Sequence, residues 1–136
     1  MNADNAIDAY LKINQHHYRF IREMNPSILY DIQKYYPASW EHFHLHKNNF
    51  VKNIITDNLL QGIKEGLFRA DMSPAIIALF YIYKMEVFAD PHLLRDHGLE
   101  RTECLPELAK YHLLGITTDA GKDYLKSQKL FNHDEA

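Results

Sequence analysis

Apolar residues recur at steps of three and four along most of this chain, the spacing of one face of an α-helix. The first such stripe is made by Ile7, Tyr10, Leu11, Tyr18 and Ile21. Asn25-Pro26 ends it, because the residue before a proline avoids the helical region. We predict a first helix over Asp4–Met24 and a short second helix over Ser27–Tyr36, which Pro37 breaks.

The next two helices differ in how their apolar residues are distributed. Ala38–Glu65 predicts one long helix whose lysines lie mostly opposite an apolar side made by Trp40, Phe43, Phe50, Val51, Ile54, Ile55, Leu59 and Ile63. Pro74–Ala89 is apolar nearly all round and is interrupted only by Lys84 and Glu86. Because an all-round apolar helix is typical of the centre of a bundle, we expect Pro74–Ala89 to be the most buried helix.

The rest of the chain predicts a polar loop and two further helices. Asp90–Arg101 is polar, contains a proline and a glycine, and is expected to be a flexible loop. Glu103–Thr117 predicts a fifth helix, and Thr118 or Asp119 would cap a last helix over Ala120–Leu130. Since no stretch alternates as a strand would, we predict an all-α, single-domain bundle of about six helices over residues 1–136.

Composition agrees with a globular helical protein and narrows its class. Hydrophobic residues make up 46% of the 136 residues, with only five Gly and five Pro. The net charge of -3, without a basic stripe, is unlike a nucleic-acid-binding domain. A single Cys104 excludes an internal disulfide and indicates a reducing compartment. No signal peptide or membrane-spanning stretch is evident, so we expect a cytoplasmic protein with no membrane partner.

The histidines at positions 42, 44 and 46 are the most suggestive metal-site pattern. His42 and His46 lie one helical turn apart, but zinc normally takes three or four protein ligands and the sequence offers no obvious third. Glu41-x-x-His44 matches half of a di-iron motif, whose second copy is missing. We therefore predict no metal ligands, with the binding of an ion by His42 and His46 left open.

Catalytic chemistry is not indicated elsewhere in the chain. Cys104 has glutamates at positions 100, 103 and 107, and acidic neighbours disfavour a reactive thiolate. Neither a nucleophilic triad nor a glycine-rich phosphate loop can be recognised. We expect no catalytic residues, no cofactor and no enzyme activity.

Aromatic residues are the stronger signal, with one Trp, nine Tyr and seven Phe. Those on the two central helices could line a cavity for an apolar ligand: Trp40, Phe43, Phe50, Phe80, Tyr81 and Tyr83. Each of them could instead fill the core. A tyrosine such as Tyr18 or Tyr81 could present its hydroxyl to the polar end of a ligand.

Two helix junctions carry a family resemblance. The first is Gly66-Leu67-Phe68-Arg69-Ala70-Asp71-Met72-Ser73-Pro74, and the second is Gly115-Ile116-Thr117-Thr118-Asp119-Ala120-Gly121. Gly66 can end a helix in the left-handed conformation, and Ser73 followed by Pro74 can begin one. These junctions, together with residues 25–37 followed by Trp40, resemble the C-terminal domain of TetR-type bacterial transcriptional regulators.

The resemblance implies an effector-sensing and dimerisation domain. Residues 1–24 would then be the helix that connects to a helix-turn-helix domain, which is not in this chain, so DNA would be bound only through that missing domain. The resemblance places a mostly apolar small-molecule effector among the central helices, against a wall of Tyr18, Trp40, Phe43, Phe50, Tyr81 and Met85.

The same resemblance implies a homodimer joined through residues 103–131. Apolar residues there cover more than one face of their helices, which leaves a second stripe for a partner copy: Leu105, Leu108, Tyr111, Leu113, Leu114, Ile116 and Tyr124. Two alternatives stay open, namely a helical protein-interaction module without a small ligand and a helical metal-dependent enzyme.

Overall fold

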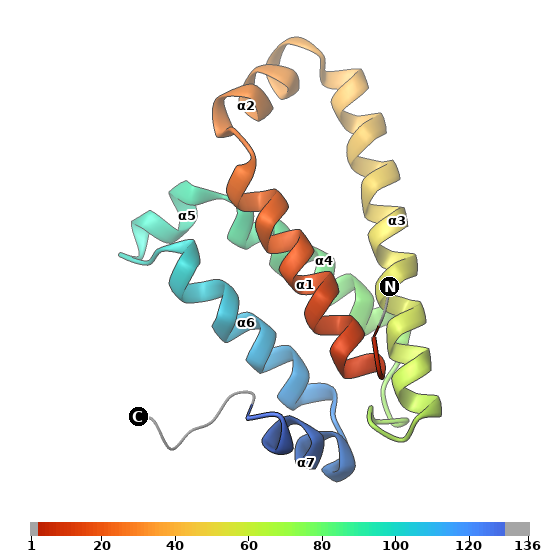
Figure 1. Cartoon of the computed structure of the whole chain (residues 1–136). Coiled ribbons are helices and arrows are strands. Elements are labelled where there is room, and N and C mark those ends of the chain that lie inside the picture. Colours follow the sequence, from red (N-terminus) through yellow and green to blue (C-terminus); the bar gives the residue numbers. More distant parts are fainter. Residues whose placement is uncertain (1–2, 130–136) are drawn as a thin grey trace.

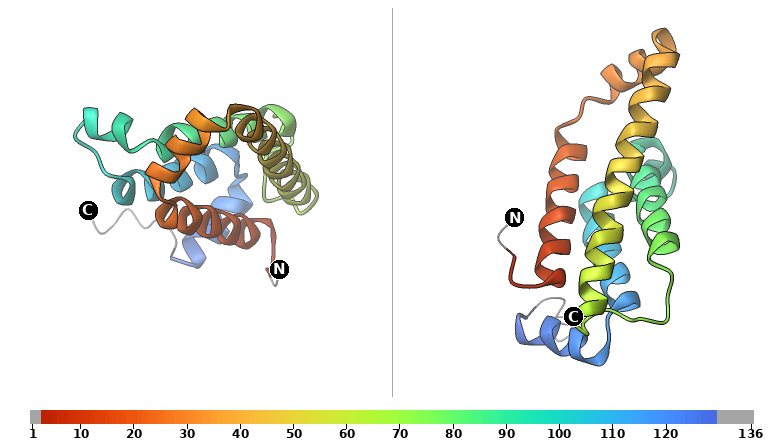
Figure 2. Two further views of the ribbon diagram at one scale, coloured as in Figure 1. Left: turned by 90° about the horizontal axis from the view of Figure 1, so that it is seen from above. Right: turned by 90° about the vertical axis from the view of Figure 1, so that its right-hand side faces the viewer.

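The computed structural model describes residues 3–129, and these residues form seven helices and no β-strand. The helices are α1 (Ala6–Glu23), α2 (Pro26–Tyr35), α3 (Pro37–Lys64), α4 (Pro74–Ala89), α5 (Pro91–Asp96), α6 (Arg101–Ile116) and α7 (Asp119–Ser127). Helices α1, α3, α4 and α6 form the body of the bundle, and α7 lies across one end (Figure 1). At the other end, α2 and the beginning of α3 extend beyond the remaining helices (Figure 2). The predicted all-α fold is confirmed.

The described part of the chain has one helix more than the predicted six, and this helix lies in the segment that was expected to be a flexible loop. Residues Pro91–Asp96 form α5, and the Asp90 side chain accepts a hydrogen bond from the backbone N–H of His92 at 2.9 Å. An aspartate at the N-cap followed by proline at the first helical position is a strong helix start. The prediction of a loop over all of Asp90–Arg101 was therefore wrong, since this start signal was present.

The capping chemistry predicted for the two junctions is confirmed. Gly66 follows the end of α3 with φ +76°, a conformation that glycine adopts at little cost. The Ser73 hydroxyl accepts a hydrogen bond from the N–H of Ile76 at 3.4 Å and caps α4. Thr118 is the cap of α7, because its hydroxyl accepts from the N–H of Gly121 at 3.2 Å.

The two junctions, about fifty residues apart in the sequence, pair with each other in space. Phe68 and Thr117 form an isolated antiparallel bridge. The N–H of Arg69 donates to the carbonyl of Ile116 at 2.7 Å, and the N–H of Thr118 donates to the carbonyl of Leu67 at 2.9 Å. These backbone bonds fasten the α3–α4 connection to the α6–α7 connection.

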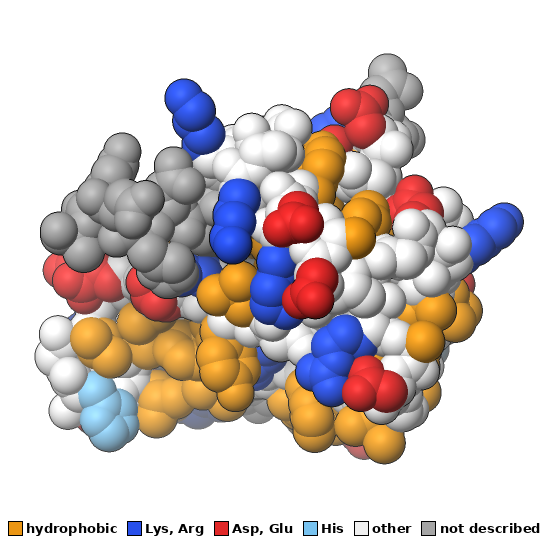
Figure 3. Space-filling view, turned by 90° about the horizontal axis from the view of Figure 1, so that it is seen from below, with side chains coloured by type: hydrophobic (Ala, Val, Ile, Leu, Met, Phe, Trp, Pro, Cys, Tyr) orange, Lys and Arg blue, Asp and Glu red, His pale blue; other side chains and the backbone are white. Residues whose placement is uncertain are grey.

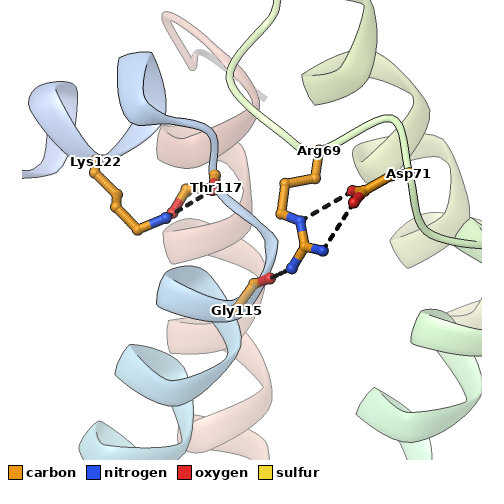
Figure 4. Close-up of polar contacts among 5 residues, drawn as sticks. All are labelled: Arg69, Asp71, Gly115, Thr117 and Lys122. Atoms are coloured by element: carbon orange, nitrogen blue, oxygen red, sulfur yellow. Dashed lines mark hydrogen bonds and ion pairs between the residues drawn. The ribbon is translucent and has the colours of Figure 1, made fainter.

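Side chains reinforce the same contact (Figure 4). The Arg69 guanidinium donates to both carboxylate oxygens of Asp71 at 3.0 Å and to the carbonyl of Gly115 at 2.9 Å. Lys122 donates to the carbonyl of Thr117 at 2.8 Å. The last carbonyls of α6 thereby gain cationic partners, which suit the negative end of a helix dipole. This end of the bundle is therefore held by a continuous hydrogen-bond network.

The hydrophobic core lies toward this fastened end. It takes residues from the first half of α1, the second half of α3, the first half of α4 and the second half of α6. Its buried members are Ala6, Ile7, Tyr10, Ile13, Ile55, Leu59, Phe68, Ala78, Tyr81, Ala109, Leu113, Ile116 and Leu125.

Helix α4 is not the most buried helix, contrary to expectation. Ile76, Phe80 and Tyr83 are 52%, 58% and 59% exposed, while Ala78 and Tyr81 are buried. The all-round apolar character therefore reflects two apolar faces, one against this protomer's own core and one directed outward. Apolarity alone does not say which molecule covers a face, and this is why the prediction was wrong.

Candidate functional site

A cavity of about 490 Å³ occupies the end of the bundle opposite the fastened junctions. Its wall comes mainly from the second half of α1, from α2, from the first half of α3 and from the second half of α4, with His92 of α5 and Arg101 of α6. Its size falls within the roughly 300–1,000 Å³ typical of small-molecule sites. Helices α1, α3 and α4 thus each contribute one half to the packed core and the other half to the cavity wall.

The cavity wall divides into an apolar part and a polar part. The apolar and aromatic side chains are Phe20, Ile21, Met24, Leu29, Tyr30, Trp40, Val51, Tyr81, Ile82 and Met85. The polar side chains are His17, Gln33, His44, Lys47, Asn48, Glu86, Asp90, His92 and Arg101. An apolar body with a polar end is the kind of molecule that such a wall fits.

One hydrogen bond crosses the wall directly from α1 to α4. The Nδ1 of His17 and the hydroxyl of Tyr81 lie 2.6 Å apart. Burial, and then the nearby His16 and Lys47, lower the pKa of His17 to about 4, while burial raises the pKa of the Tyr81 hydroxyl. Both groups are therefore neutral near pH 7, and a hydrogen bond between the imidazole and the tyrosine hydroxyl joins the two helices.

Tyr81 also connects the cavity to the core. Its ring meets Tyr10 edge-on, with centroids 6.0 Å apart, and Tyr10 stacks on His112 of α6 at 4.5 Å. Burial, and then Lys84, lower the pKa of His112 to about 3, so this ring is neutral. Its Nε2 is buried with no hydrogen-bond partner within residues 3–129. Helices α1, α4 and α6 therefore share one aromatic cluster directly beneath the cavity.

A second set of polar side chains joins α3 to α4. Glu86 Oε1 lies 2.9 Å from Nε2 of His44 and accepts a hydrogen bond from the Asn48 amide at 2.8 Å. Trp40 stacks on the His44 ring with centroids 5.4 Å apart. His44 and Asn48 are one turn apart, so a single stripe of α3 carries this group. It holds the two helices together at the middle of the cavity wall.

Three of the six predicted ligand-binding residues line the cavity, namely Trp40, Tyr81 and Met85. The other three do not. Phe43 and Phe50 are 52% and 62% exposed on a different stripe of α3, and Tyr18 lines a smaller neighbouring hollow of about 180 Å³. The reason is helical phase, because the stripe that contains Trp40 continues through position 44 and not through position 43.

The residues that sequence reasoning missed are mostly polar. His17, His44, Asn48 and Glu86 were not considered as wall residues, and Lys47 was placed on the polar side of α3 although it lines the cavity. The available signal was their spacing, since positions 40, 44, 47, 48 and 51 share one face of a helix. The predicted ligand-binding set contained only aromatic side chains and one methionine, so it did not include this polar stripe.

The structure places the predicted dimer residues in different environments, some in the core and others at the surface. Leu105, Leu113 and Ile116 are at most 3% exposed within the protomer's own core, so their assignment to a dimer interface was wrong. Leu108 and Tyr124 are half-buried, and the Tyr124 hydroxyl donates to Asp8 at 2.8 Å. Of the predicted set, only Tyr111 and Leu114 are exposed, at 73% and 36%.

An outward apolar surface is nevertheless present, and we name it the α4–α6 face. It comprises Ile76, Leu79, Phe80, Tyr83 and Val87 of α4 with Tyr111 and Leu114 of α6. Lys84 of α4 lies 5.5 Å from the centre of the Tyr111 ring and links the two helices. Figure 3 views the molecule from below, and hydrophobic side chains gather toward the lower edge, the side on which α4 lies.

Neither a metal-binding cluster nor a membrane-spanning helix is present in residues 3–129. Within this range no group of three or more His, Cys, Asp or Glu side chains is placed to hold a metal ion. His42 and His46 are exposed, and His44 is paired with Glu86. None of the helices within the same range has the length and apolarity needed to cross a membrane.

Comparisons with protein-family models, curated protein sequences and solved structures gave no match for this chain. The function therefore has to be argued from the cavity and the α4–α6 face themselves.

Proposed function

We propose that this chain is an effector-sensing and dimerisation module that binds a mostly apolar small molecule. The observation that carries the proposal is the cavity of about 490 Å³ between α1, α2, α3 and α4. Its wall contains Trp40, Tyr81 and Met85, and aromatic and methionine surfaces suit apolar ligands of variable shape.

Helix α1 is the part of the module that a ligand would move. Its first turn is held by Glu65, which accepts from the N–H of Ala6 at 2.8 Å, and by Asn58, which donates to the Ala6 carbonyl at 2.9 Å. Its second half forms cavity wall and is joined to α4 through the bond between His17 and Tyr81. A ligand that displaces this wall would tilt α1 about its fixed first turn.

This mechanical arrangement suits the TetR-like role that the junction motifs resemble. In such a regulator the tilt of α1 would pass to a helix-turn-helix domain and change the spacing of two DNA-reading helices. Ligand and DNA would then affect each other's affinity by the same factor, because coupling between sites is reciprocal.

Dimerisation is the second part of the proposal and rests on the α4–α6 face. Two copies of the α4 and α6 pair would form a four-helix interface related by a two-fold axis. The apolar side chains extend along α4 from Ile76 to Val87, about three turns of helix. A continuous exposed apolar stripe of this length marks an interaction surface.

A thermal-shift screen of small apolar compounds tests the sensing function. Binding to the folded state alone stabilises it by about 2.7 kcal/mol at a ligand concentration one hundred times the Kd. Val51→Phe, which adds a ring to the cavity wall, is expected to abolish the shift, whereas Ile28→Phe on an exposed position outside the wall keeps it. The absence of any shift in the parent protein would leave only the interaction-module interpretation.

A further inference from the structure

The acidic groups of the cavity wall already have hydrogen-bond donors. Glu86 accepts from the Asn48 amide and lies 2.9 Å from His44, as described above. The carboxylate of Asp90 accepts from the backbone N–H of His92 at 2.9 Å and caps α5. Each of the two carboxylates is therefore already partly satisfied by donors of the protein.

The two cationic side chains of the wall differ from each other in their hydrogen-bond partners. Arg101 donates to the carbonyl of Ile21 at 3.1 Å, at the end of α1. Lys47 is half-buried in the wall, and its side chain forms no hydrogen bond or ion pair within residues 3–129. Its ammonium group therefore presents up to three donors and one positive charge that forms no ion pair within residues 3–129.

A neutral donor accompanies this charge. His17 lines the same cavity as Lys47, and the charge of Lys47 contributes to the lowered pKa of His17. In the tautomer that accepts the Tyr81 proton at Nδ1, the neutral His17 ring carries its own proton on Nε2 and can donate to a ligand. Lys47 and this donor together match the charge and the acceptor oxygens of a carboxylate.

The apolar part of the wall indicates which kind of molecule carries the anionic group. Phe20, Ile21, Met24, Leu29, Ile82 and Met85 offer an apolar surface that an extended hydrocarbon can cover. Resting on the effector-sensing function proposed above, we propose that the ligand is an amphipathic monocarboxylate whose carboxylate pairs with Lys47 and whose hydrocarbon body lies against this apolar wall.

Three ten-carbon probes that differ only in the head group test this proposal, namely decanoate, decanol and decylamine, each below its critical micelle concentration. Isothermal titration of the full chain is expected to give decanoate a Kd about tenfold below those of the other two, since charge-assisted hydrogen bonds are the stronger ones. Lys47→Gln should raise the decanoate Kd to the decanol value and leave decanol binding unchanged. Lys52→Gln, which removes a charge from the same helix outside the wall, should keep the preference.

The outcomes separate this inference from the function on which it rests. Equal binding of decanoate and decanol, tighter binding of decylamine, or an unchanged preference in Lys47→Gln would overturn the monocarboxylate assignment alone. Failure of all three probes would also overturn it, and the sensing function itself fails only if the wider apolar screen is negative as well. Thermal unfolding of Lys47→Gln, expected to match the parent, confirms that the variant is folded.

Discussion

Replacing Phe80 by glutamate separates dimerisation from folding. Phe80 is 58% exposed at the middle of the α4–α6 face, so the protomer does not need it for its own core. In a two-fold interface the same side chain occurs twice, once from each copy. Phe80→Glu is therefore expected to leave the protomer folded and to prevent its association.

The size of the effect follows from the exposed area. A phenylalanine side chain presents about 200 Å², and 58% of this is about 115 Å² in the protomer. At about 25 cal/mol per Å², its burial contributes about 3 kcal/mol, or about 6 kcal/mol for the two copies. Because each 1.4 kcal/mol is tenfold, the dimer should weaken by a factor of at least about a hundred, even if half of this is realised.

Sedimentation velocity at micromolar concentration measures the outcome, with circular dichroism to verify folding. Phe50→Glu is the matched control, because Phe50 is 62% exposed on α3, outside the α4–α6 face, and this variant should remain dimeric. Leu113→Glu, by contrast, should unfold the protomer, since it buries an unpaired charge in the core. A parent protein that sediments as a monomer, or a Phe80→Glu variant that remains a dimer, would refute the proposed interface.

Two further predictions concern stability. Since the folded chain keeps His17 and His112 neutral, with pKa values of about 4 and 3, the unfolded chain binds more protons below its histidine pKa of about 6.5. The free energy of unfolding should therefore fall as the pH decreases from about 6.5 toward 4, by at most about 1.4 kcal/mol per pH unit for each histidine. Urea unfolding at several pH values measures this dependence, and the free energy of unfolding of His17→Gln should change less steeply with pH than that of the parent. Gly62→Ala should destabilise the protein by about 1–3 kcal/mol, because the new methyl group would overlap the Phe68 ring. Adding Phe68→Leu to that variant should restore part of this loss in urea unfolding, and a Gly62→Ala variant as stable as the parent would contradict the packing.

The all-α class and the local capping chemistry were the parts of the fold that could be predicted. The conformations at Gly66, Ser73 and Thr118 depend on a few neighbouring residues, and the structure confirms all three. The pairing of the two junctions through Arg69 could not be derived in the same way. It depends on backbone contacts between segments about fifty residues apart, for which the sequence has no local signal.

The candidate site was predictable only in part, for two physical reasons. A small difference in helical phase decides whether a side chain faces the cavity, as Trp40 does, or solvent, as Phe43 does. In addition, a charged residue such as Lys47 looks like a solvated surface position until the fold shows that its helix borders a cavity. The outward face of α4 was misjudged because hydrophobicity does not identify the molecule that buries it.

The fluorescence of Trp40 during a ligand titration tests the sensing function most directly. Trp40 is the only tryptophan in the chain, and it lines the cavity on α3. A compound that raises the melting temperature is predicted to give a saturable change in tryptophan emission with the same Kd, and neither effect should occur in Val51→Phe. A compound that stabilises the protein without changing Trp40 emission, or that acts equally on Val51→Phe, would contradict binding in this cavity.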